Sequence, residues 1–421
     1  ASHGWNLYRD FNRAGWNFKD AIQIVAARFG GWPYFKISIK NRNAPPYDNL
    51  LTIGEAELGL PDKRFYFLDE RHPIVKAYLV LIKDILALLV NISTEQSRIF
   101  AERIFNYESR IARDTIAMTN DKINETKSHI FTLQQLSNEA QQLPIMNTAK
   151  AMFNARITEY TEVFVENLYA LKAASLVLSS TDTDMRNDYI IWCLVRQFLP
   201  YMPREFHNAL EEFDRVVYGI NEQLPMWYYC TKLVENWLSF GLRALQQNPK
   251  LIKKNNQEKS TLSKSSHDDY QSQSLISNRI NYDEELVKLI FYHTRNELKS
   301  LVNDAAWINE RLSNYIIDKL SHLKLQIGIP EELLLNDSFV NDYYREDDMN
   351  LLTIEFAKNL ENRWSFIKIK MEKLLKNMTR NEKIIADLFP ECNNCKEKLK
   401  SIKYSISLNM VIISKEAVQQ P

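Results

Sequence analysis

Seven histidines and four cysteines are the residues of this 421-residue chain with the most evident chemistry. A zinc-peptidase helix carries His-Glu-x-x-His, because two histidines one turn apart face the same metal and the glutamate activates a water. No two histidines here have that spacing, and none is followed by Glu. We therefore interpret all seven as surface or lightly buried residues: His3, His72, His129, His207, His267, His293 and His322.

The cysteines favour a disulfide or free thiols over a metal or redox site. Cys392 and Cys395 form a Cys-x-x-Cys, but a structural zinc site needs a second ligand pair, and Cys193 and Cys230 are too far apart to supply it. The sequence also has no Gly-rich phosphate loop and no G-x-S-x-G motif. It predicts no catalytic residue, no metal ligand and no cofactor in this chain, which we expect to be inactive by itself.

Composition limits the classes of partner. The formal net charge is +0, which does not indicate a nucleic-acid partner, because proteins that bind nucleic acids carry a basic footprint. The proportions of hydrophobic (45%) and charged (25%) residues are those of a globular protein. The most apolar stretch, residues 74–90, is interrupted by Lys76, Lys83 and Asp84, so we expect no membrane span.

The elements predicted to position these residues are helices. Only 9 Gly and 13 Pro occur, and few chain breakers favour long helices. Apolar residues recur every three or four positions over 99–116 and over 283–302, where Asp283 is the expected N-cap. We predict an all-α protein, with further helices over 158–180, 188–199 and 356–375.

Composition also divides the chain into segments. Residues 246–278 are mostly Lys, Asn, Gln, Ser and Asp, and cannot bury enough apolar surface to offset the entropy of ordering them. The helical pattern ends near Pro390, and a β-prone run follows at Met410–Ile413. The expected organisation is an N-terminal arm (1–23), a first helical part (24–245), a polar mobile loop (246–278), a second helical part (279–389) and a tail (390–421).

Short motifs follow one another along the chain: Gly30-Gly31-Trp32-Pro33, Leu58-Gly59-Leu60-Pro61, Tyr107-Glu108-x-x-Ile111-Ala112, Trp227-x-x-Cys230 and Trp307-Ile308-Asn309. Over about residues 24–421 this series resembles the neprilysin and endothelin-converting-enzyme family of zinc metallopeptidases. The resemblance implies structural roles for Gly31, Trp32, Pro33, Leu60, Pro61, Tyr107, Glu108, Trp227, Cys230, Trp307, Gly328, Pro330 and Tyr344.

The resemblance further implies that the chain corresponds to the family's large, multi-helical N-terminal region, which helps to enclose a chamber for small peptides. The family's zinc is bound further along its chains, in a catalytic half that is missing here. Aligned on Asn409, the family's substrate-gripping Asn-Ala pair becomes Ser401-Ile402, so a hydrogen-bonding side chain is lost. The family's partner for Cys230 also lies in a segment missing here, which leaves this thiol free or re-paired.

Three functions are open. The first is a non-catalytic pseudopeptidase that binds a peptide or a protein. The second is the non-catalytic part of an active zinc metalloendopeptidase whose catalytic half lies outside this chain. The third is an unrelated helical interaction protein. The expected partners are accordingly a peptide or protein ligand, a catalytic-half chain or a second copy.

Four sequons, at Asn91, Asn124, Asn336 and Asn377, are candidate glycosylation sites. They are compatible with the extracellular or secretory location that the resemblance implies. They do not establish it, because several sequons arise by chance in a chain so rich in Asn.

The tail raises a separate expectation. Residues 411–413 are apolar and β-branched, and an isolated strand of this kind exposes unpaired backbone groups to any passing chain. The preceding residues, 396–403, are highly charged. We therefore expect the strand to pair with a partner rather than fold back onto the helical region.

The polar composition of residues 246–278 makes this segment the expected first site of proteolytic nicking. Limited digestion with trypsin, followed by mass spectrometry of the fragments, should find the earliest cuts after Lys250, Lys253, Lys254, Lys259 or Lys264. Early cleavage confined to other parts of the chain would show that this segment is protected.

Overall fold

The computed structural model forms two compact units. It describes residues 4–5, 7–8, 11–41, 49–120, 129–153, 157–220, 225–247, 268–330, 333, 339–345, 352, 355–375, 384, 402–406 and 408–413. The first unit is Ala1–Lys40, Asn49–Leu233 and Leu351–Leu375, and the second is Asn41–Asp48, Val234–Asn350 and Lys376–Pro421. Helices dominate and the sheets are small, which confirms the prediction of a mostly α-helical protein.

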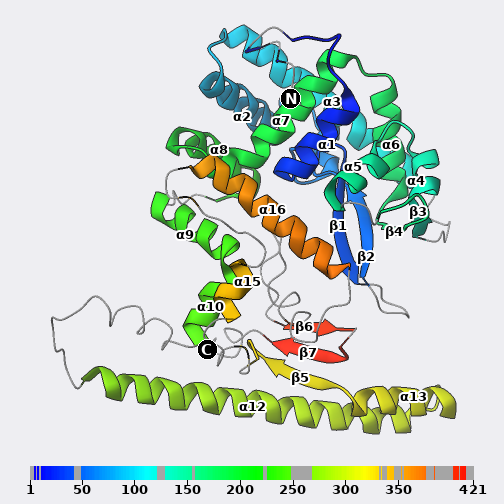
Figure 1. Ribbon diagram of the computed structural model, residues 1–421, viewed down its shortest axis with the longest axis vertical. Helices are drawn as coiled ribbons and strands as arrows, with labels where there is room; N and C mark the ends of the chain where they lie inside the picture. Colours follow the sequence, from blue (N-terminus) through cyan, green and yellow to red (C-terminus); the bar gives the residue numbers. More distant parts are fainter. Residues whose placement is uncertain are drawn as a thin grey trace. The chain divides into compact units, whose positions relative to one another are not determined.

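The first unit is organised around its longest helix, α3 (Thr94–Asn120), against which α2 and α6 pack (Figure 1). As the apolar spacing predicted, Phe100, Ile104, Tyr107 and Ile111 lie on its buried face. The other helical elements of this unit are α1 (Phe18–Phe29), η1 (Lys63–Phe67), α2 (Pro73–Leu89), α4 (Leu133–Glu139), α5 (Ile145–Phe153), α6 (Leu168–Ser179), α7 (Thr183–Phe198), η3 (Leu199–Tyr201), α8 (Arg204–Tyr218) and α16 (Phe356–Leu374).

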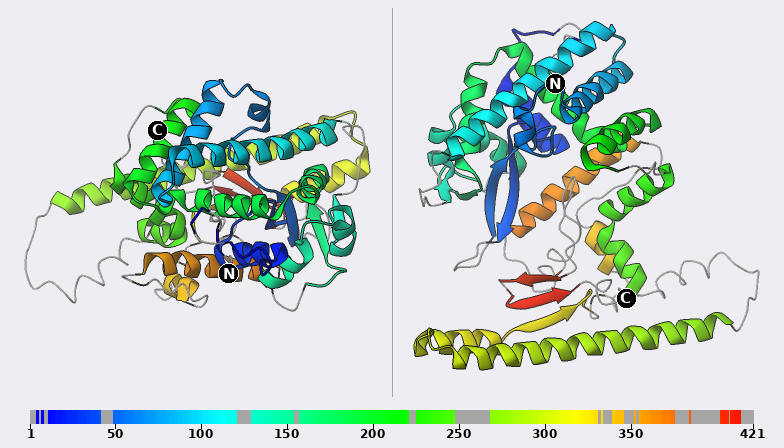
Figure 2. Two further views of the ribbon diagram at one scale, coloured as in Figure 1. Left: turned by 90° about the horizontal axis from the view of Figure 1, so that it is seen from above. Right: turned by 180° about the vertical axis from the view of Figure 1, so that it is seen from behind.

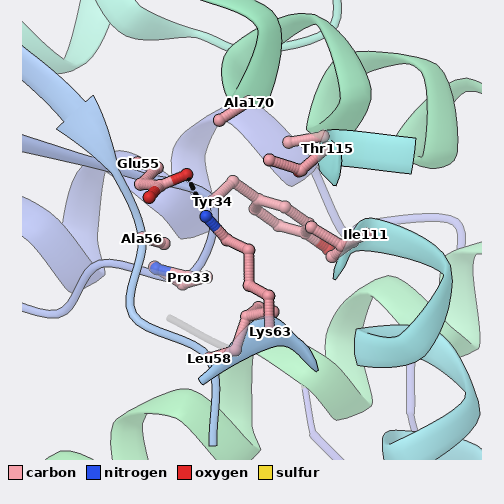
Figure 3. A pocket seen from close by; sticks show the side chains of 10 residues that line it. Pro33, Tyr34, Glu55, Ala56, Leu58, Lys63, Ile111, Thr115 and Ala170 are labelled. Atoms are coloured by element: carbon pink, nitrogen blue, oxygen red, sulfur yellow. Dashed lines mark hydrogen bonds and ion pairs between the residues drawn. The ribbon is translucent and has the colours of Figure 1, made fainter. Parts of the chain in front are cut away.

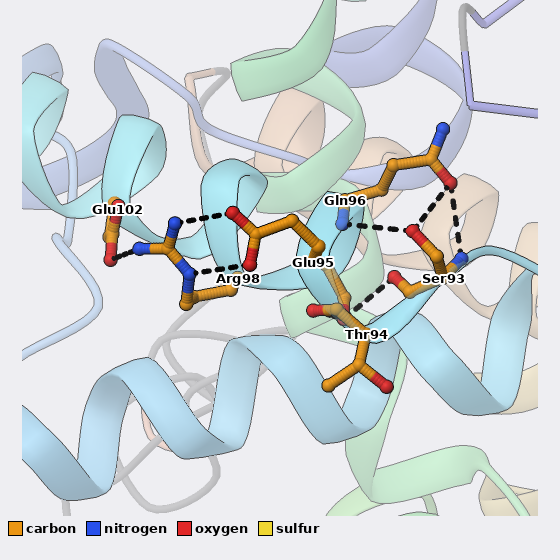
Figure 4. A network of polar contacts seen from close by, with 7 residues as sticks. Ser93, Thr94, Glu95, Gln96, Arg98 and Glu102 are labelled. Atoms are coloured by element: carbon orange, nitrogen blue, oxygen red, sulfur yellow. Dashed lines mark hydrogen bonds and ion pairs between the residues drawn. The ribbon is translucent and has the colours of Figure 1, made fainter.

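Helix α3 begins at a capping box (Figure 4). Ser93 Oγ accepts the backbone N–H of Gln96 at 3.2 Å, and Gln96 Oε1 accepts the backbone N–H of Ser93 at 3.1 Å. Arg98 then pairs with Glu95 and Glu102, one turn to either side. These contacts satisfy donors that the first turn of a helix leaves free, and so fix where α3 starts.

A four-stranded sheet completes the first unit. Its strands are β1 (Phe35–Asn41), β2 (Asn49–Glu55), β3 (Ile130–Thr132) and β4 (Glu162–Val165), in the order β1-β2-β4-β3. Strand β2 runs parallel to β4, with Leu51 opposite Val163, and β3 runs antiparallel to β4. Leu51, Thr52 and Ile53 are all buried, so β2 is covered on both faces.

The structure corrects three of the expected boundaries. The helix expected from residue 158 begins at Leu168, because Glu162–Val165 alternates as a strand and the side chain of Asn167 caps α6. Asp283 is not an N-cap but lies inside α12 (Asp268–Asp304). Residues 268–278 of the expected loop therefore belong to a helix. Residues 248–267 lie outside the described segments.

The second unit combines helices with a three-stranded sheet. It contains α10 (Ser239–Gln247), α12, α13 (Glu310–Ser321), β5 (Lys324–Ile327), α15 (Phe339–Arg345), β6 (Ile402–Ser405) and β7 (Met410–Ile413). The strand order is β5-β7-β6, and α12 lies beside this sheet, in contact with β5 and α13 (Figures 1 and 2). Helix α9 (Met226–Trp237) crosses the boundary between the units in sequence. Within the described segments, no helix is long and apolar enough to span a bilayer.

The tail forms the strand that was expected, but that strand does not need a partner chain. Strand β7 is central: it pairs in parallel with β5 and antiparallel with β6. Met410 and Ile412 point into an apolar cluster that includes Phe240 and Ile329. The expectation of an external partner for β7 is therefore wrong, because both of its edges are paired within the chain and its apolar side chains are buried there.

This packing predicts unequal effects for two isoleucines of one sheet. Ile412→Ala should lower the free energy of unfolding by about 2–5 kcal/mol, because it leaves a cavity at a side chain that is 1% exposed. Ile402→Ala, at 61% exposure on the neighbouring strand, should change it by less than about 0.5 kcal/mol. Urea denaturation followed by circular dichroism measures both, and equal effects would mean that β7 is not part of the core.

Candidate functional site

Residues of the sequence motifs form a polar cluster around a buried carboxylate, Glu108 on α3. Its side chain is fully buried. Tyr66 and Tyr78 each donate a hydroxyl to Glu108 Oε2 at 2.8 Å. The backbone N–H of Gly59 and the guanidinium of Arg196 donate to Oε1, at 3.2 Å and 3.3 Å.

The Leu-Gly-Leu-Pro motif and the α3 motif therefore meet at this one group. The hydroxyl of Tyr66 also accepts the backbone N–H of Leu60 at 2.9 Å, and Trp192 Nε1 donates to the hydroxyl of Tyr78 at 3.2 Å. Position 59 must be Gly, because a Cβ added there would lie 1.7 Å from the hydroxyl oxygen of Tyr78. The Leu-Gly-Leu-Pro sequence thus gives backbone access to the carboxylate.

Electrostatics keep the donors of this cluster protonated. Burial raises the pKa of Tyr66 and of Tyr78 well above the ordinary value, and the neighbouring Glu108 raises them further. Burial also raises the pKa of Glu108, opposed by Arg196 and by the two tyrosine hydroxyls. A carboxylate with four donors and no solvent access has no room for a substrate, so we assign Glu108 a structural role rather than acid–base catalysis.

The Gly-Gly-Trp-Pro motif links α1 to α16. Gly30 ends α1 in the left-handed conformation, at φ 65°, which a glycine adopts without strain. Trp32 then packs edge-on against Trp364, at 6.0 Å between ring centroids, and Trp364 donates its indole N–H to the backbone of Ala26. Gly31 lies close to Val25, whose Cγ1 would be 2.5 Å from an added Cβ.

A small cavity lies beside this motif (Figure 3). Its lining includes Pro33, Tyr34 and Ile111, and Lys63 pairs with Glu55 across it at 2.5 Å. The volume is about 10 Å³, room for no more than one water. The cavity is too small for a peptide or a cofactor, and we assign it no binding role.

The remaining motif residues of the second unit are structural or exposed. Gly328 adopts φ 63° after β5, and the buried Pro330 follows Ile329 of the apolar cluster. Tyr344 packs against that cluster and accepts the backbone N–H of Gly241 at 3.1 Å. Trp307, by contrast, is 84% exposed.

The Trp-x-x-Cys motif lies on the surface of α9. Trp227 is 68% exposed, and Cys230 is an exposed free thiol. Cys193 is free but buried, and burial raises its pKa to about 12, so it is not a reactive thiolate. Cys392 and Cys395 lie outside the described residues.

Asn409 makes the turn between β6 and β7. It adopts φ 46°, a left-handed conformation that Asn tolerates better than most residues. Its Nδ2 donates to the backbone carbonyl of Lys319 at 2.8 Å, and its Oδ1 accepts the hydroxyl of Tyr404 at 2.9 Å. Of the altered pair before it, Ile402 is exposed on β6, whereas Ser401 lies outside the described residues.

The other residues singled out from the sequence do not come together in a common site. Leu60 is buried, Pro61 is exposed, and Tyr107 is buried with its hydroxyl 3.2 Å from that of Tyr34. Asn91 is exposed, as a glycan acceptor must be, whereas Asn124, Asn336 and Asn377 lie outside the described residues. Over the described part of the chain, no three His, Cys, Asp or Glu side chains cluster as metal ligands would.

Several residues of the polar clusters were not identified from sequence. Tyr78, Trp192 and Arg196 have no local motif, and only their partners across the fold reveal them. Asp188 is a second case: it accepts the indole N–H of Trp5 at 2.9 Å, and burial raises its pKa to about 6. Only the structure shows that this acid is buried, because the neighbouring Asn187 is buried as well and the buried face of α7 is therefore not purely apolar.

The chain matches the family model described as Peptidase family M13 over residues 4–330. Endothelin-converting enzyme 1 of Bos taurus is 28% identical over 244 residues, covering 57% of this chain and 32% of that protein. Membrane metallo-endopeptidase-like 1 of Mus musculus is 20% identical over 387 residues, covering 88% of this chain and 46% of that protein. The chain therefore spans about a third to a half of the length of these relatives.

Two solved structures share the fold at low identity. The Mycobacterium tuberculosis zinc metalloprotease Zmp1, in complex with an inhibitor, has a TM-score of 0.66 at 14% identity, covering 97% of this chain and 55% of that chain. PepO from Lactobacillus rhamnosis has a TM-score of 0.66 at 13% identity, covering 96% and 56%. Nearly all of this chain therefore has a structural counterpart in each of these proteins.

The hydrogen bonds around Glu108 predict a large loss of stability when its side chain is shortened. Glu108→Ala should lower the free energy of unfolding by about 3–5 kcal/mol, because it leaves Arg196 and two hydroxyls buried without their acceptor. Glu108→Gln should cost less, since one acceptor oxygen remains. The matched control is Glu102→Ala on the same helix, where loss of a solvent-exposed ion pair should cost less than about 1 kcal/mol. Chemical denaturation compares the three, and equal effects of the two alanine variants would contradict this role.

Proposed function

Because this chain belongs to peptidase family M13, we propose that it acts as the helical, ligand-binding region of a neprilysin-like protein, without zinc chemistry of its own. The ligand is a peptide or a protein, engaged through apolar contacts. The family match and the shared fold support the scaffold part of this proposal. They also make the third hypothesis, an unrelated helical interaction protein, wrong.

The surface of β6 carries the proposal. Partners in the sheet place Ile402 beside Ile413, and Tyr404 beside Val411, so these side chains share one face. Ile402 is 61% exposed and Tyr404 is also exposed, whereas the opposite face carries the buried Met410 and Ile412. The family uses a strand-edge Asn at the preceding position to grip a substrate, and here the corresponding pair is Ser401-Ile402. An apolar contact at Ile402 replaces that hydrogen bond in our proposal.

A second function is favoured by a different observation. Helix α12 carries apolar residues on two faces: Val287 and Phe291 are half-buried, whereas Leu289, Ile290 and Leu301 are exposed. Exposed apolar side chains gathered on one helix mark a surface that another polypeptide covers. A further polypeptide over α12 is what a catalytic half would supply, in which case this chain is the non-catalytic part of an active zinc metalloendopeptidase. A second copy of this chain would cover the same residues.

The proposal places the binding role, but no catalysis, in this chain. The purified protein should contain no stoichiometric zinc by plasma mass spectrometry, and should not cleave fluorogenic peptides whether or not a chelator is present. One tightly bound zinc per chain, together with peptidase activity that a chelator abolishes, would overturn the non-catalytic assignment.

Binding is tested with fluorescently labelled apolar peptides by anisotropy. Ile402→Asp should weaken their binding roughly tenfold, because it removes apolar burial worth about 1.5 kcal/mol or more. Leu176→Asp, a matched change at an exposed apolar residue of α6, should leave binding unchanged. Equal affinity of the wild type and Ile402→Asp would show that β6 is not the contact surface.

A further inference from the structure

His207, on α8, is a buried titratable side chain that the proposed function does not use. It is 2% exposed, so the interpretation of this histidine as a surface or lightly buried residue was wrong, and its Nδ1 has no hydrogen-bond partner. The ring also makes a hydrogen bond with the backbone of Met202. Most buried polar atoms are satisfied, so an unpartnered ring nitrogen at this depth requires a physical account.

The ring of His207 packs against α9. Its centroid lies 4.6 Å from that of Tyr229, at an interplanar angle of 44°. The hydroxyl of Tyr229 in turn donates to Glu211 of α8 at 3.1 Å. A tilted ring contact and a hydrogen bond thus attach the first turn of α9 to α8. No residue of α9 is itself fully buried. An element with so few buried side chains is sensitive to any change in these contacts.

The charges around the ring oppose its protonation. Burial lowers the pKa of His207, and the nearby guanidinium of Arg204 lowers it further. Glu211 acts in the other direction, but its two oxygens already accept Tyr229 and Arg204, the latter at 3.3 Å. Helix α2, which also packs against α8, directs its Tyr78 to Glu108. A proton added at Nδ1 would therefore create a buried cation without an acceptor.

We propose that His207 makes the packing of α9 against α8 sensitive to acid: the neutral imidazole allows the contact, and protonation releases it. Helix α9 carries the chain from the first unit into the second, with the boundary between Leu233 and Val234. Protonation of His207 therefore acts on the segment that connects the two units in sequence. It is independent of the peptide-binding role.

The direction of the pH dependence follows from the linkage between this contact and proton binding at His207. The folded pKa lies below the ordinary value of 6.5, so the contact binds fewer protons than the released state. Its contribution to stability is fully present above pH 6.5, and is lost as the pH falls through the lowered folded value. Mild acidification should therefore loosen α9 before carboxylates begin to protonate throughout the chain.

A nitroxide label on Cys230 reports the mobility of α9 directly, because this exposed thiol follows Tyr229 on that helix. Cys193 is buried and its pKa is about 12, so it remains unlabelled, and Cys392→Ser with Cys395→Ser removes the other two thiols. Between about pH 7.5 and about pH 5, the mobile fraction of the electron paramagnetic resonance spectrum should rise. In His207→Phe, which keeps a ring but cannot take a proton, it should stay constant.

Two further variants complete the experiment. His207→Gln, also neutral, replaces His207→Phe if circular dichroism shows that the latter does not fold. His322→Gln is the matched control: this histidine lies on the surface of α13 beside Asp318, and its loss should leave the acid response intact. The proposal is overturned if label mobility does not change on acidification, or if it changes equally in the neutral His207 variants.

Discussion

A single buried negative charge organises the first unit. Glu108 is held by donors from η1, α2, α7 and the loop at Gly59, so its carboxylate joins α3 to four other parts of the chain. Burying a charge is costly, and only a complete set of donors offsets that cost. The elements that carry those donors are therefore restricted to positions compatible with the carboxylate. Position 59 must be Gly for the same reason, and the capping box at Ser93 fixes where the helix that carries Glu108 begins.

The sequence could predict part of this arrangement. Periodicity predicted α3, α7 and α16, because a buried helical face leaves a pattern within its own residues. The motifs indicated that Leu60, Tyr107 and Glu108 matter, but not that Tyr66 and Gly59 converge on Glu108. Arg196 and Tyr78 have no local pattern, since what defines them is a contact across the fold. The prediction of a polar loop over 246–278 was wrong at both of its described ends. Residues 246–247 belong to α10, and residues 268–278, which lack apolar residues at regular spacing, extend a helix that is apolar further along.

In the second unit, the sequence likewise predicted a strand but not the strands with which it pairs. The β-prone run at Met410–Ile413 was evident, but its parallel pairing with β5 joins residues that are far apart in sequence, and nothing local encodes that pairing. Of the charged run 396–403 that argued against burial, Lys403 lies on β6, an edge strand among the described segments that exposes Ile402 and Tyr404, whereas residues 396–401 lie outside those segments. Asn409 is the local feature that makes the sheet feasible, because it tolerates the left-handed turn and anchors it to Lys319.

Glu108 and His207 illustrate two uses of a buried titratable group. Around Glu108 each oxygen has two donors, and the cluster resists change, because any alteration leaves other buried groups unpaired. Around His207 one nitrogen has no partner, and Glu211, which favours protonation of the ring, already accepts Arg204 and Tyr229. The first arrangement stabilises the interior of a unit. The second stabilises a contact in one protonation state only, and it lies where the chain leaves that unit.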